Sequence, residues 1–356
     1  MQNTINLYET TTMLEAIKLF KQPYTFFRDT FFPNIKTFPT EKVLIDIVKG
    51  GEKMAPFIAP RINGSIDDRL GYSTNELTTP RVAPKRVLTG EDLAKRQPGD
   101  NVYTTRSPQE VAASILVQDL TDLDNQITRT EEWFAVQVML GEKFDITLED
   151  ENGNKAGTFS VDYGFDNSVE IAADEKWGTK TGTKITAADV DVIAKIEEWI
   201  EDYIIKNSIA TPDIAVLDPD AGKAFVNNAV VQKLLTLRAQ SGFRQEPTFK
   251  GQGVTFLGVF TKYNLEFYTY SNFIKNEEES EQLLPSGTVI VAQSGQGTLA
   301  YGAVTQKESG AWMKYMEKRV PKYIIDDKNE TDTIKLTSRP LPYQKDINSY
   351  VVATVL

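Results

Sequence analysis

The chain has 356 residues, 40 % hydrophobic and 25 % charged, an ordinary composition for a folded chain that is too long for one hydrophobic core. It contains no cysteine and no histidine, which excludes disulfides, thiolate metal sites, cysteine nucleophiles and imidazole chemistry. The net charge of −11 argues against a protein that binds nucleic acid through its phosphates. No apolar run approaches the ~20 residues that span a bilayer, and the first residues lack a signal peptide's features. We therefore expect a cytoplasmic protein that is not an enzyme.

The charge is spread unevenly along the chain. Residues 1–106 carry 15 Lys/Arg and 12 Asp/Glu, whereas the rest carries 24 Lys/Arg and 38 Asp/Glu. One interpretation is a solvated acidic body that keeps the protein in solution. The other is that the mildly basic segment of one copy lies on the acidic body of another copy.

Residues 1–40 read as an N-terminal arm. A short helical stretch around Leu14 and Ile17 is followed by a cluster of six aromatic residues between positions 24 and 38. Pro23, Pro33 and Pro39 interrupt this cluster, so it is neither one helix nor a central strand. Such an arm either folds back onto the chain's own core or inserts into a neighbour's surface.

Residues 41–90 read as an extended loop with two arms and a polar tip. A partly amphipathic strand begins near Val43, a polar, glycine-containing stretch covers residues 61–71, and Pro80 and Pro84 punctuate the returning arm. About fifty residues is long for a loop inside a compact domain, and few of these side chains could fill a core. We expect that something other than the segment's own domain orders it.

A long helix is predicted over residues 107–140. Ser107 and Glu110 form a capping box with Pro108 at the first helical position, and Gly141 is expected to cap the other end. Apolar residues recur in steps of four and three, at Leu116, Leu120, Leu123, Ile127 and Phe134. At 1.5 Å per residue the helix is about 50 Å long. A coiled coil is an alternative, but a spine helix lying on a sheet fits the short seam better.

The following elements are a hairpin and an α/β lobe. Residues 142–165 form the hairpin, with a type I′ turn signal at Asn152-Gly153. In the lobe, Ile193, Ile196, Ile200, Ile204 and Ile205 mark an amphipathic helix, and the apolar spacing from Val226 to Leu237 marks one or two more. Strands are predicted at 214–217, 254–259, 265–270 and 289–292. Two tail strands, 334–336 and 350–355, are expected to rejoin the first lobe.

The motifs that carry chemistry are absent or weak. Asp150 begins a pattern like a calcium-binding loop, but Lys155 stands where glycine is needed and Val161 where glutamate is needed, which favours a hairpin turn. The glycines at 295 and 297 follow a strand, yet no helix start follows to hold a dinucleotide. No phosphate-binding loop or nucleophile elbow occurs. We predict no catalytic, cofactor-binding or metal-binding residue.

The first quarter of the chain contains a series of recognisable motifs. They are Phe26-Phe27-Arg28-Asp29, Thr40-Glu41-Lys42-Val43, residues 54–60 (MAPFIAP), residues 71–80 (GYSTNELTTP) and Val82-x-Pro84-Lys85. These motifs closely resemble the lambda-like major capsid protein family of tailed phages, and their order and spacing match the family over about sixty residues. Weaker agreement continues to the closing strand, with the middle lobe departing most.

The resemblance implies an α+β fold, the tailed-phage major capsid fold. Its expected parts are the N-terminal arm (1–40), the extended loop (41–90), a peripheral domain with the spine helix and hairpin (91–178), an α/β axial domain (179–308) and a return to the peripheral domain (309–356). A subunit with such an arm and loop leaves apolar and backbone groups uncovered until neighbours cover them.

The function implied is that of a major capsid protein, which self-assembles as hexamers and pentamers into the icosahedral phage head around double-stranded DNA. The implied partners are other copies and scaffold and portal proteins, with a decoration protein as a further candidate. DNA is expected to be enclosed but not specifically bound, and no cofactor and no membrane are implied. The expected location is the virion, after assembly in the host cytoplasm. Predicted intersubunit contacts are Phe26, Phe27, Phe31, Phe32, Phe57, Ile58, Arg61, Asp67, Asp68 and Arg69.

Two other functions remain open at this point. An encapsulin-like nanocompartment shell shares the architecture, although the arm and loop residues are of the phage type. A carboxylate-dependent α/β enzyme is the alternative from a different class, since fifty acidic residues supply many carboxylate pairs.

Overall fold

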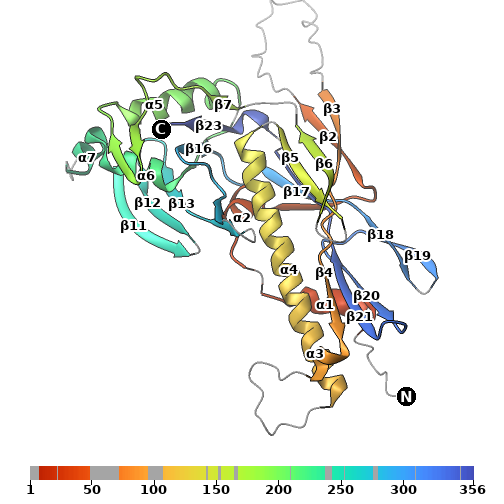
Figure 1. Ribbon diagram of the computed structural model, residues 1–356. Helices are drawn as coiled ribbons and strands as arrows, with labels where there is room; N and C mark the ends of the chain where they lie inside the picture. The colour runs from red at the N-terminus through yellow and green to blue at the C-terminus, as the bar shows by residue number, and fades with distance from the viewer. Residues whose placement is uncertain are drawn as a thin grey trace, which may run out of the picture.

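The computed structural model mixes helices and strands around one long helix, as expected for an α+β fold (Figure 1). A large sheet with its helices lies toward one end of this helix, and several small sheets lie along its other side. The structure describes residues 8–21, 23–48, 72–94, 107–141, 143–150, 154–163, 167–208, 210–236, 243–251, 253–275, 280–308, 310–344 and 346–356.

The long helix α4 spans Pro108–Leu140, which confirms the predicted spine helix. The Ser107 side chain accepts from the Glu110 N–H, and the Glu110 side chain accepts from the Ser107 N–H, so the capping box is present. Gly141 follows the last helical residue and is the C-cap, as predicted; its backbone is extended rather than left-handed, and its N–H donates to the Gln137 carbonyl. The first half buries one stripe, whereas the last three turns are buried on nearly every side.

A seven-stranded sheet organises the α/β part of the chain. Its strands lie in the order β11 (Phe243–Gly251), β12 (Val254–Phe260), β13 (Leu265–Tyr270), β10 (Ile214–Leu217), β16 (Thr288–Ala292), β23 (Tyr350–Thr354) and β7 (Ser168–Val169). The four strands predicted from apolar runs in this lobe are confirmed as β10, β12, β13 and β16.

The central strands of this sheet are buried on both faces. Side chains alternate between the faces along a strand, so Val216 and Ile290 join the core that contains α4, whereas Ala215 and Val291 join the core under the helices. This two-sided burial explains why β10 and β16 are continuous apolar runs rather than alternating ones.

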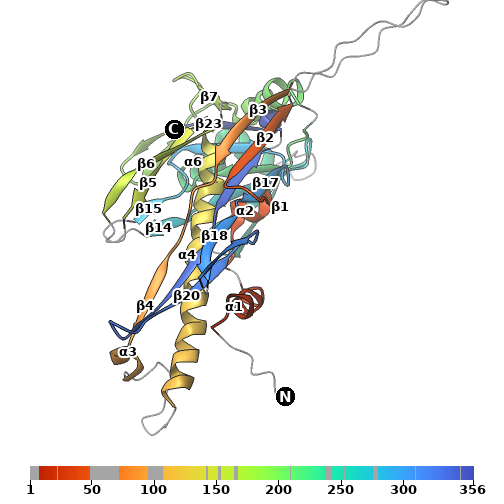
Figure 2. The same cartoon turned by 90° about the vertical axis from the view of Figure 1, so that its right-hand side faces the viewer.

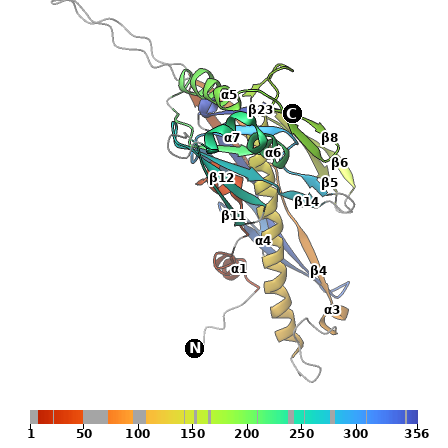
Figure 3. The same cartoon turned by 90° about the vertical axis from the view of Figure 1, so that its left-hand side faces the viewer.

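Four helical elements cover the face away from α4 (Figure 3). They are α5 (Val192–Glu198), the π-helix η1 (Trp199–Ile205), α6 (Pro219–Asn227) and α7 (Ala229–Thr236). The predicted amphipathic helix is therefore α5 continued by η1. Ile205 lies in the π-helix, whose wider turn leaves it 47 % exposed. The prediction that Ile205 belongs to the buried face of this helix was therefore wrong.

The closing strand lies elsewhere than predicted. β21 (Thr331–Thr337) pairs with β4 (Lys85–Thr89), as expected of a strand returning to the first lobe. β23 instead pairs with β16 and β7 in the seven-stranded sheet. The physical reason is that Tyr350 and Val352 are buried in one core and Val351 in the other, and only a strand between two cores buries both sets.

Small sheets and short helices surround the spine helix. A three-stranded sheet of β20 (Val320–Asp326), β21 and β4 covers the first half of α4, and α1 (Thr10–Ile17) packs into the same core through Met13. The arm supplies α2 (Phe26–Phe31) and β1 (Asn34–Thr37), which pairs with β17 (Gly297–Tyr301), itself paired with β22 (Pro340–Gln344). Other short elements are α3 (Gly90–Ala94), η2 (Ile347–Ser349), and the pairs β8 (Gly178–Thr181) with β9 (Lys184–Ala187) and β14 (Phe273–Lys275) with β15 (Ser280–Gln282).

Three further antiparallel pairs complete the described part. β5 (Lys143–Glu149) and β6 (Lys155–Asp162) confirm the predicted hairpin, although Asn152-Gly153 lies outside the described residues. β2 (Lys42–Val48) and β3 (Tyr72–Thr78) run side by side (Figure 2), and β18 (Val304–Glu308) pairs with β19 (Ala311–Tyr315). Among the helices that the structure describes, none is long and apolar enough to cross a membrane.

Candidate functional site: the arm anchor and the base of the extended loop

The arm folds back onto its own chain, which is the first of the two alternatives the sequence left open. Phe26, Phe27, Phe31 and Phe32 are each at most 5 % exposed and belong to the core between α4 and the seven-stranded sheet. The ring of Phe27 meets those of Phe31 and Tyr270 at centroid distances of 5.3 and 4.9 Å. These four rings are buried within their own chain, and their predicted role in contacts between subunits stays a prediction.

Glu132 on the spine helix receives the start of α2. Its carboxylate accepts the N–H groups of Phe26, Phe27 and Arg28 at 3.0, 2.9 and 2.9 Å, and the Tyr270 hydroxyl at 2.8 Å. The first N–H groups of a helix have no partner inside the helix, and here a buried side chain from α4 supplies one. Burial raises the pKa of Glu132, and the N–H groups of the arm oppose that shift.

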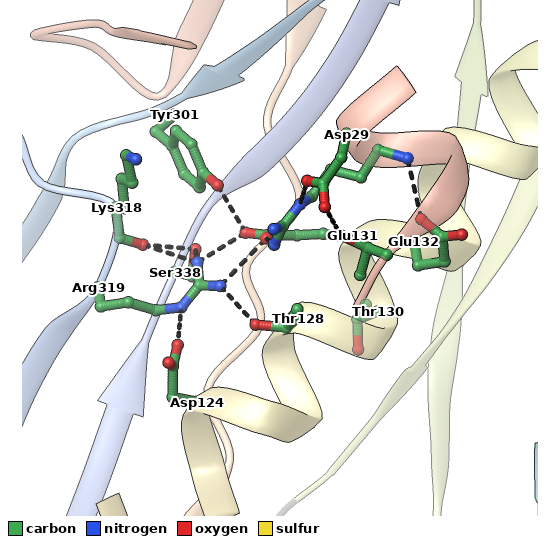
Figure 4. Close-up of polar contacts among 12 residues, drawn as sticks. Asp29, Asp124, Thr128, Thr130, Glu131, Glu132, Tyr301, Lys318, Arg319 and Ser338 are labelled. Atoms are coloured by element: carbon green, nitrogen blue, oxygen red, sulfur yellow. Dashed lines mark hydrogen bonds and ion pairs between the residues drawn. The ribbon is translucent and has the colours of Figure 1, made fainter. Parts of the chain in front are cut away.

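Glu131, the next residue, joins the arm to the tail of the chain (Figure 4). Its carboxylate accepts from Arg319 at 2.6 and 3.1 Å, from Arg28 at 3.2 Å and from the Tyr301 hydroxyl at 2.8 Å. Burial by itself would raise the pKa of Glu131, but the charges and hydrogen bonds of Arg319 and Arg28 hold it below its ordinary value.

Arg319 is the centre of this network. Its guanidinium also donates to Asp124 at 2.7 Å, and to the hydroxyls of Thr128 and Ser338, both at 3.3 Å. The side chains of Arg319, Asp124 and Glu131 are 6, 1 and 0 % exposed, so the charges are compensated inside the protein rather than by water. We call this set of Arg28, Asp124, Thr128, Glu131, Glu132, Tyr301, Arg319 and Ser338 the arm anchor.

The glycines that resembled a dinucleotide loop form the socket of the arm. The N–H of Gly295 donates to the Thr30 carbonyl at 2.9 Å, and Asn34 donates to the carbonyls of Gly295 and Gly297, both at 3.1 Å. A Cβ atom at Gly297 would lie 2.7 Å from the Phe31 carbonyl oxygen and would overlap the Phe32 ring. The strand β17 begins at Gly297, and no helix starts at these glycines, so they make room for the arm rather than for a phosphate.

The arm anchor is built to hold segments together. Every carboxylate in it is already engaged by donors from the same chain, and its charged groups are buried except for Arg28, whose side chain is 15 % exposed. Among the described residues, no group of three or more His, Cys, Asp or Glu could hold a metal ion. Asp150, the start of the calcium-like pattern, instead closes a turn: its N–H donates to the Asn154 carbonyl at 2.8 Å, and its carboxylate accepts the Asn154 N–H at 2.9 Å.

The ladder of β2 and β3 joins the two ends of the predicted extended loop. The pairing runs from Lys42 opposite Thr78 to Val48 opposite Tyr72, so the two ends of the loop lie side by side. The predicted contact residues Phe57, Ile58, Arg61, Asp67, Asp68 and Arg69 lie outside the described residues. Their role therefore stays a prediction.

Comparison with known proteins agrees with this architecture. The family model described as phage major capsid protein E matches residues 9–355. The major capsid protein of Escherichia phage lambda is 23 % identical over 354 residues, covering 98 % of both chains, and that of Enterobacteria phage phi80 is 26 % identical, covering 84 % of this chain and 85 % of its own. The crystal structure of a prophage capsid protein from E. coli CFT073 superposes with a TM-score of 0.67 at 16 % identity, covering 98 % of this chain and 99 % of its own. The capsid of Ralstonia phage GP4 gives a TM-score of 0.51 at 12 % identity, covering 93 % of this chain and 91 % of its own.

The fold is that of the tailed-phage capsid proteins. The match over nearly the whole chain is more specific, and the chain belongs to the phage major capsid protein E family. It is a phage major capsid protein, a component of the virion that assembles with copies of itself into the head shell. The phage relatives decide between the two shell-forming alternatives in favour of the phage capsid.

Proposed function

We propose that this chain assembles as hexamers and pentamers into a closed phage head. The extended loop of each subunit, residues 48–85, lies over the neighbouring subunit. The family match across residues 9–355 carries the proposal. The ladder of β2 and β3 supports it, because this ladder brings together the two ends of a segment whose sequence contains Met54, Phe57 and Ile58. Apolar side chains in a segment of this kind are covered when they pack on another subunit.

The other partners follow from the same assignment. A scaffold protein and a portal protein would be needed in the host cytoplasm to start and size the shell, and a decoration protein would bind from outside. The protein performs no catalysis of its own. The packaged DNA is held by confinement and counter-ions, because an acidic body repels phosphate.

Replacement of residues 61–71 by a short Gly-Ser linker tests the loop. The spine helix and the seven-stranded sheet are untouched, so we expect a folded subunit with an unchanged circular dichroism spectrum. Co-expressed with the phage's own head genes, the unaltered chain should give shells in electron micrographs, and the linker variant should give none or shells that break on mild heating. Single charge changes at Arg61 or Arg69 are the matched controls, and they should weaken particles only slightly.

The outcomes separate two failures. If the unaltered chain gives only small species under these conditions, shell formation itself is contradicted. If the linker variant forms heat-resistant shells like the parent, the loop does not carry the contact.

A further inference from the structure

The hairpin of β18 and β19 carries an uncovered tryptophan. Trp312 is 72 % exposed, and Met313 and Met316 are about half exposed. The hairpin is a two-stranded sheet that contacts the body along one face, where buried Gln306 donates to the Pro321 carbonyl at 3.2 Å and the Glu308 carboxylate accepts from the Thr10 hydroxyl at 2.8 Å. Two strands alone are marginally stable in water, and large exposed apolar groups of this kind mark contact surfaces.

One face of this hairpin is cationic. Lys307 is paired with Trp312 and Thr305 with Lys314, so these four side chains share one face of the ladder. Thr305 and Lys314 also line a hollow of about 590 Å³, together with Arg81. Lys307, Lys314 and Arg81 form no ion pair with any residue that the structure describes, whereas the two carboxylates of the hollow, Glu41 and Glu76, are paired with Arg339 and Lys42. The face therefore has positive charge left for a partner.

The neighbouring hairpin has the complementary surface. The turn between β20 and β21 carries Asp326, Asp327 and Glu330, and Ile325 beside it is 65 % exposed. The Asp326 carboxylate accepts from the Lys328 N–H at 3.1 Å and from the Asn329 amide at 2.7 Å, which fixes the turn. Asp327 and Glu330 form no ion pair within the described part of the chain. Both hairpins lie on the side of α4 away from the seven-stranded sheet (Figure 1).

We propose that the cationic face of the β18–β19 hairpin binds the acidic β20–β21 turn of a second copy, with Trp312 packing against Ile325. An exposed tryptophan between two lysines, facing an exposed isoleucine beside three carboxylates, combines an apolar centre with opposite charges around it. The two surfaces are different patches of one chain, so the contact is heterologous and repeats from copy to copy until a ring closes. The inference rests on the proposed shell and names one of the surfaces that build it.

Charge reversal tests this pairing. Lys307→Glu with Lys314→Glu should lower the yield of shells at least tenfold relative to the parent, because like charges then face each other. Adding Asp327→Lys and Glu330→Lys to the same chain should restore most of the yield. The matched control is Lys184→Glu with Lys233→Glu, which makes the same change in net charge beside the large sheet and should leave the yield unchanged.

The possible results are distinct. A parent that forms no shells contradicts the proposed function, whereas a parent and a reversed variant with equal yields contradict only the pairing. If the yield of shells falls and the second pair of substitutions does not restore it, the pairing is overturned. The cationic face would then bind another partner, such as an acidic scaffold protein or DNA.

Cross-linking tests the contact directly, because the chain has no cysteine of its own. Shells of a Lys314→Cys, Asp327→Cys variant should give a ladder of covalent multimers after mild oxidation. Either single variant should stay monomeric on the same gel. Oxidised double-variant shells that run only as monomers would contradict a contact between copies.

Discussion

Gly297 matters because it has no side chain. The arm crosses β17 so closely that a Cβ atom there would lie 2.7 Å from the Phe31 carbonyl oxygen. We expect Gly297→Ala to lower the free energy of unfolding of the subunit by about 1–3 kcal/mol, the usual cost of overfilling a packed site. Urea unfolding followed by tryptophan fluorescence measures this difference.

Gly157→Ala is the control for that substitution. Gly157 also lies in a strand, β6, but a Cβ atom there would meet nothing within 4 Å. Equal unfolding midpoints for the two alanine variants would show that the arm does not need the space at Gly297.

Glu131 holds two arginines that have little access to water. Glu131→Gln keeps the shape of the side chain but leaves Arg319 and Arg28 without this counter-charge, which should cost about 3–5 kcal/mol of stability. The control is Glu15→Gln, which removes the exposed partner of Lys18 and should leave the urea midpoint almost unchanged. Similar midpoints for both variants would contradict the importance of the buried network.

The two adjacent glutamates predict opposite responses to pH. The pKa of Glu131 is lower in the folded chain than its ordinary value of 4.5, so its contribution to stability is present above that value and is lost as the pH falls through the folded pKa. The pKa of Glu132 is raised, so its contribution is full below the ordinary value and declines as the pH rises through the folded pKa. Unfolding of the parent and of Glu131→Gln between pH 3 and 7 separates the two, since the loss of stability below about pH 4.5 should be smaller in the variant. If the variant loses as much stability at acid pH as the parent does, other carboxylates are responsible for that loss.

The sequence could not identify these residues as a site. Two adjacent glutamates in a helix usually lie on a solvated face, and Arg319 lies 188 residues from Glu131. Only the tertiary fold brings the arm, the spine helix and the tail to one point. One signal was available: the residues after Glu132 are mostly apolar, which indicates that the helix is buried on nearly all sides there. A charged side chain in such a segment has no solvent-exposed face to occupy.

At the scale of elements, the sequence predicts the bounds of a helix well when all the residues that determine them are close together in the chain. Ser107, Pro108 and Glu110 set the start of α4, and the apolar spacing gave its course, so its bounds were predicted almost to the residue. The position of β23 was not predictable in this way. Its alternating pattern fits any strand buried on both sides, and the choice of β16 as its neighbour depends on the two cores that meet there.

The arm should be an essential element of the subunit core. Removing the rings of Phe27 and Phe31 deletes two fully buried side chains, each of which should contribute about 3–5 kcal/mol. We expect Phe27→Ala with Phe31→Ala to lower both the unfolding temperature of the subunit and the yield of shells. Phe249→Ala removes a ring that is largely exposed and should change neither measurement by much. A double variant that assembles with the parent's yield and heat resistance would contradict this role.

At the scale of the whole molecule, the acidic body should keep the subunit off DNA. The residues after 106 carry 14 more acidic than basic groups, which opposes contact with phosphate. Purified subunits should therefore show no measurable binding to duplex DNA at ~0.15 M salt in a filter or anisotropy assay. Retention of DNA that weakens steeply as salt is added would show that the cationic hairpin face, or another basic surface, binds phosphate after all.

The contact between the arm and β17 joins residues that are synthesised far apart in time. Asn34 leaves the ribosome long before Gly295, the socket residue that it contacts 261 positions later. At ~5–20 residues per second, this interval lasts roughly 13–52 s. Throughout it the phenylalanines beside Asn34 have no finished core to enter, so each nascent chain presents an aromatic segment to chaperones or to other nascent chains. Because the socket is translated late, the order of synthesis itself delays the appearance of assembly-competent subunits.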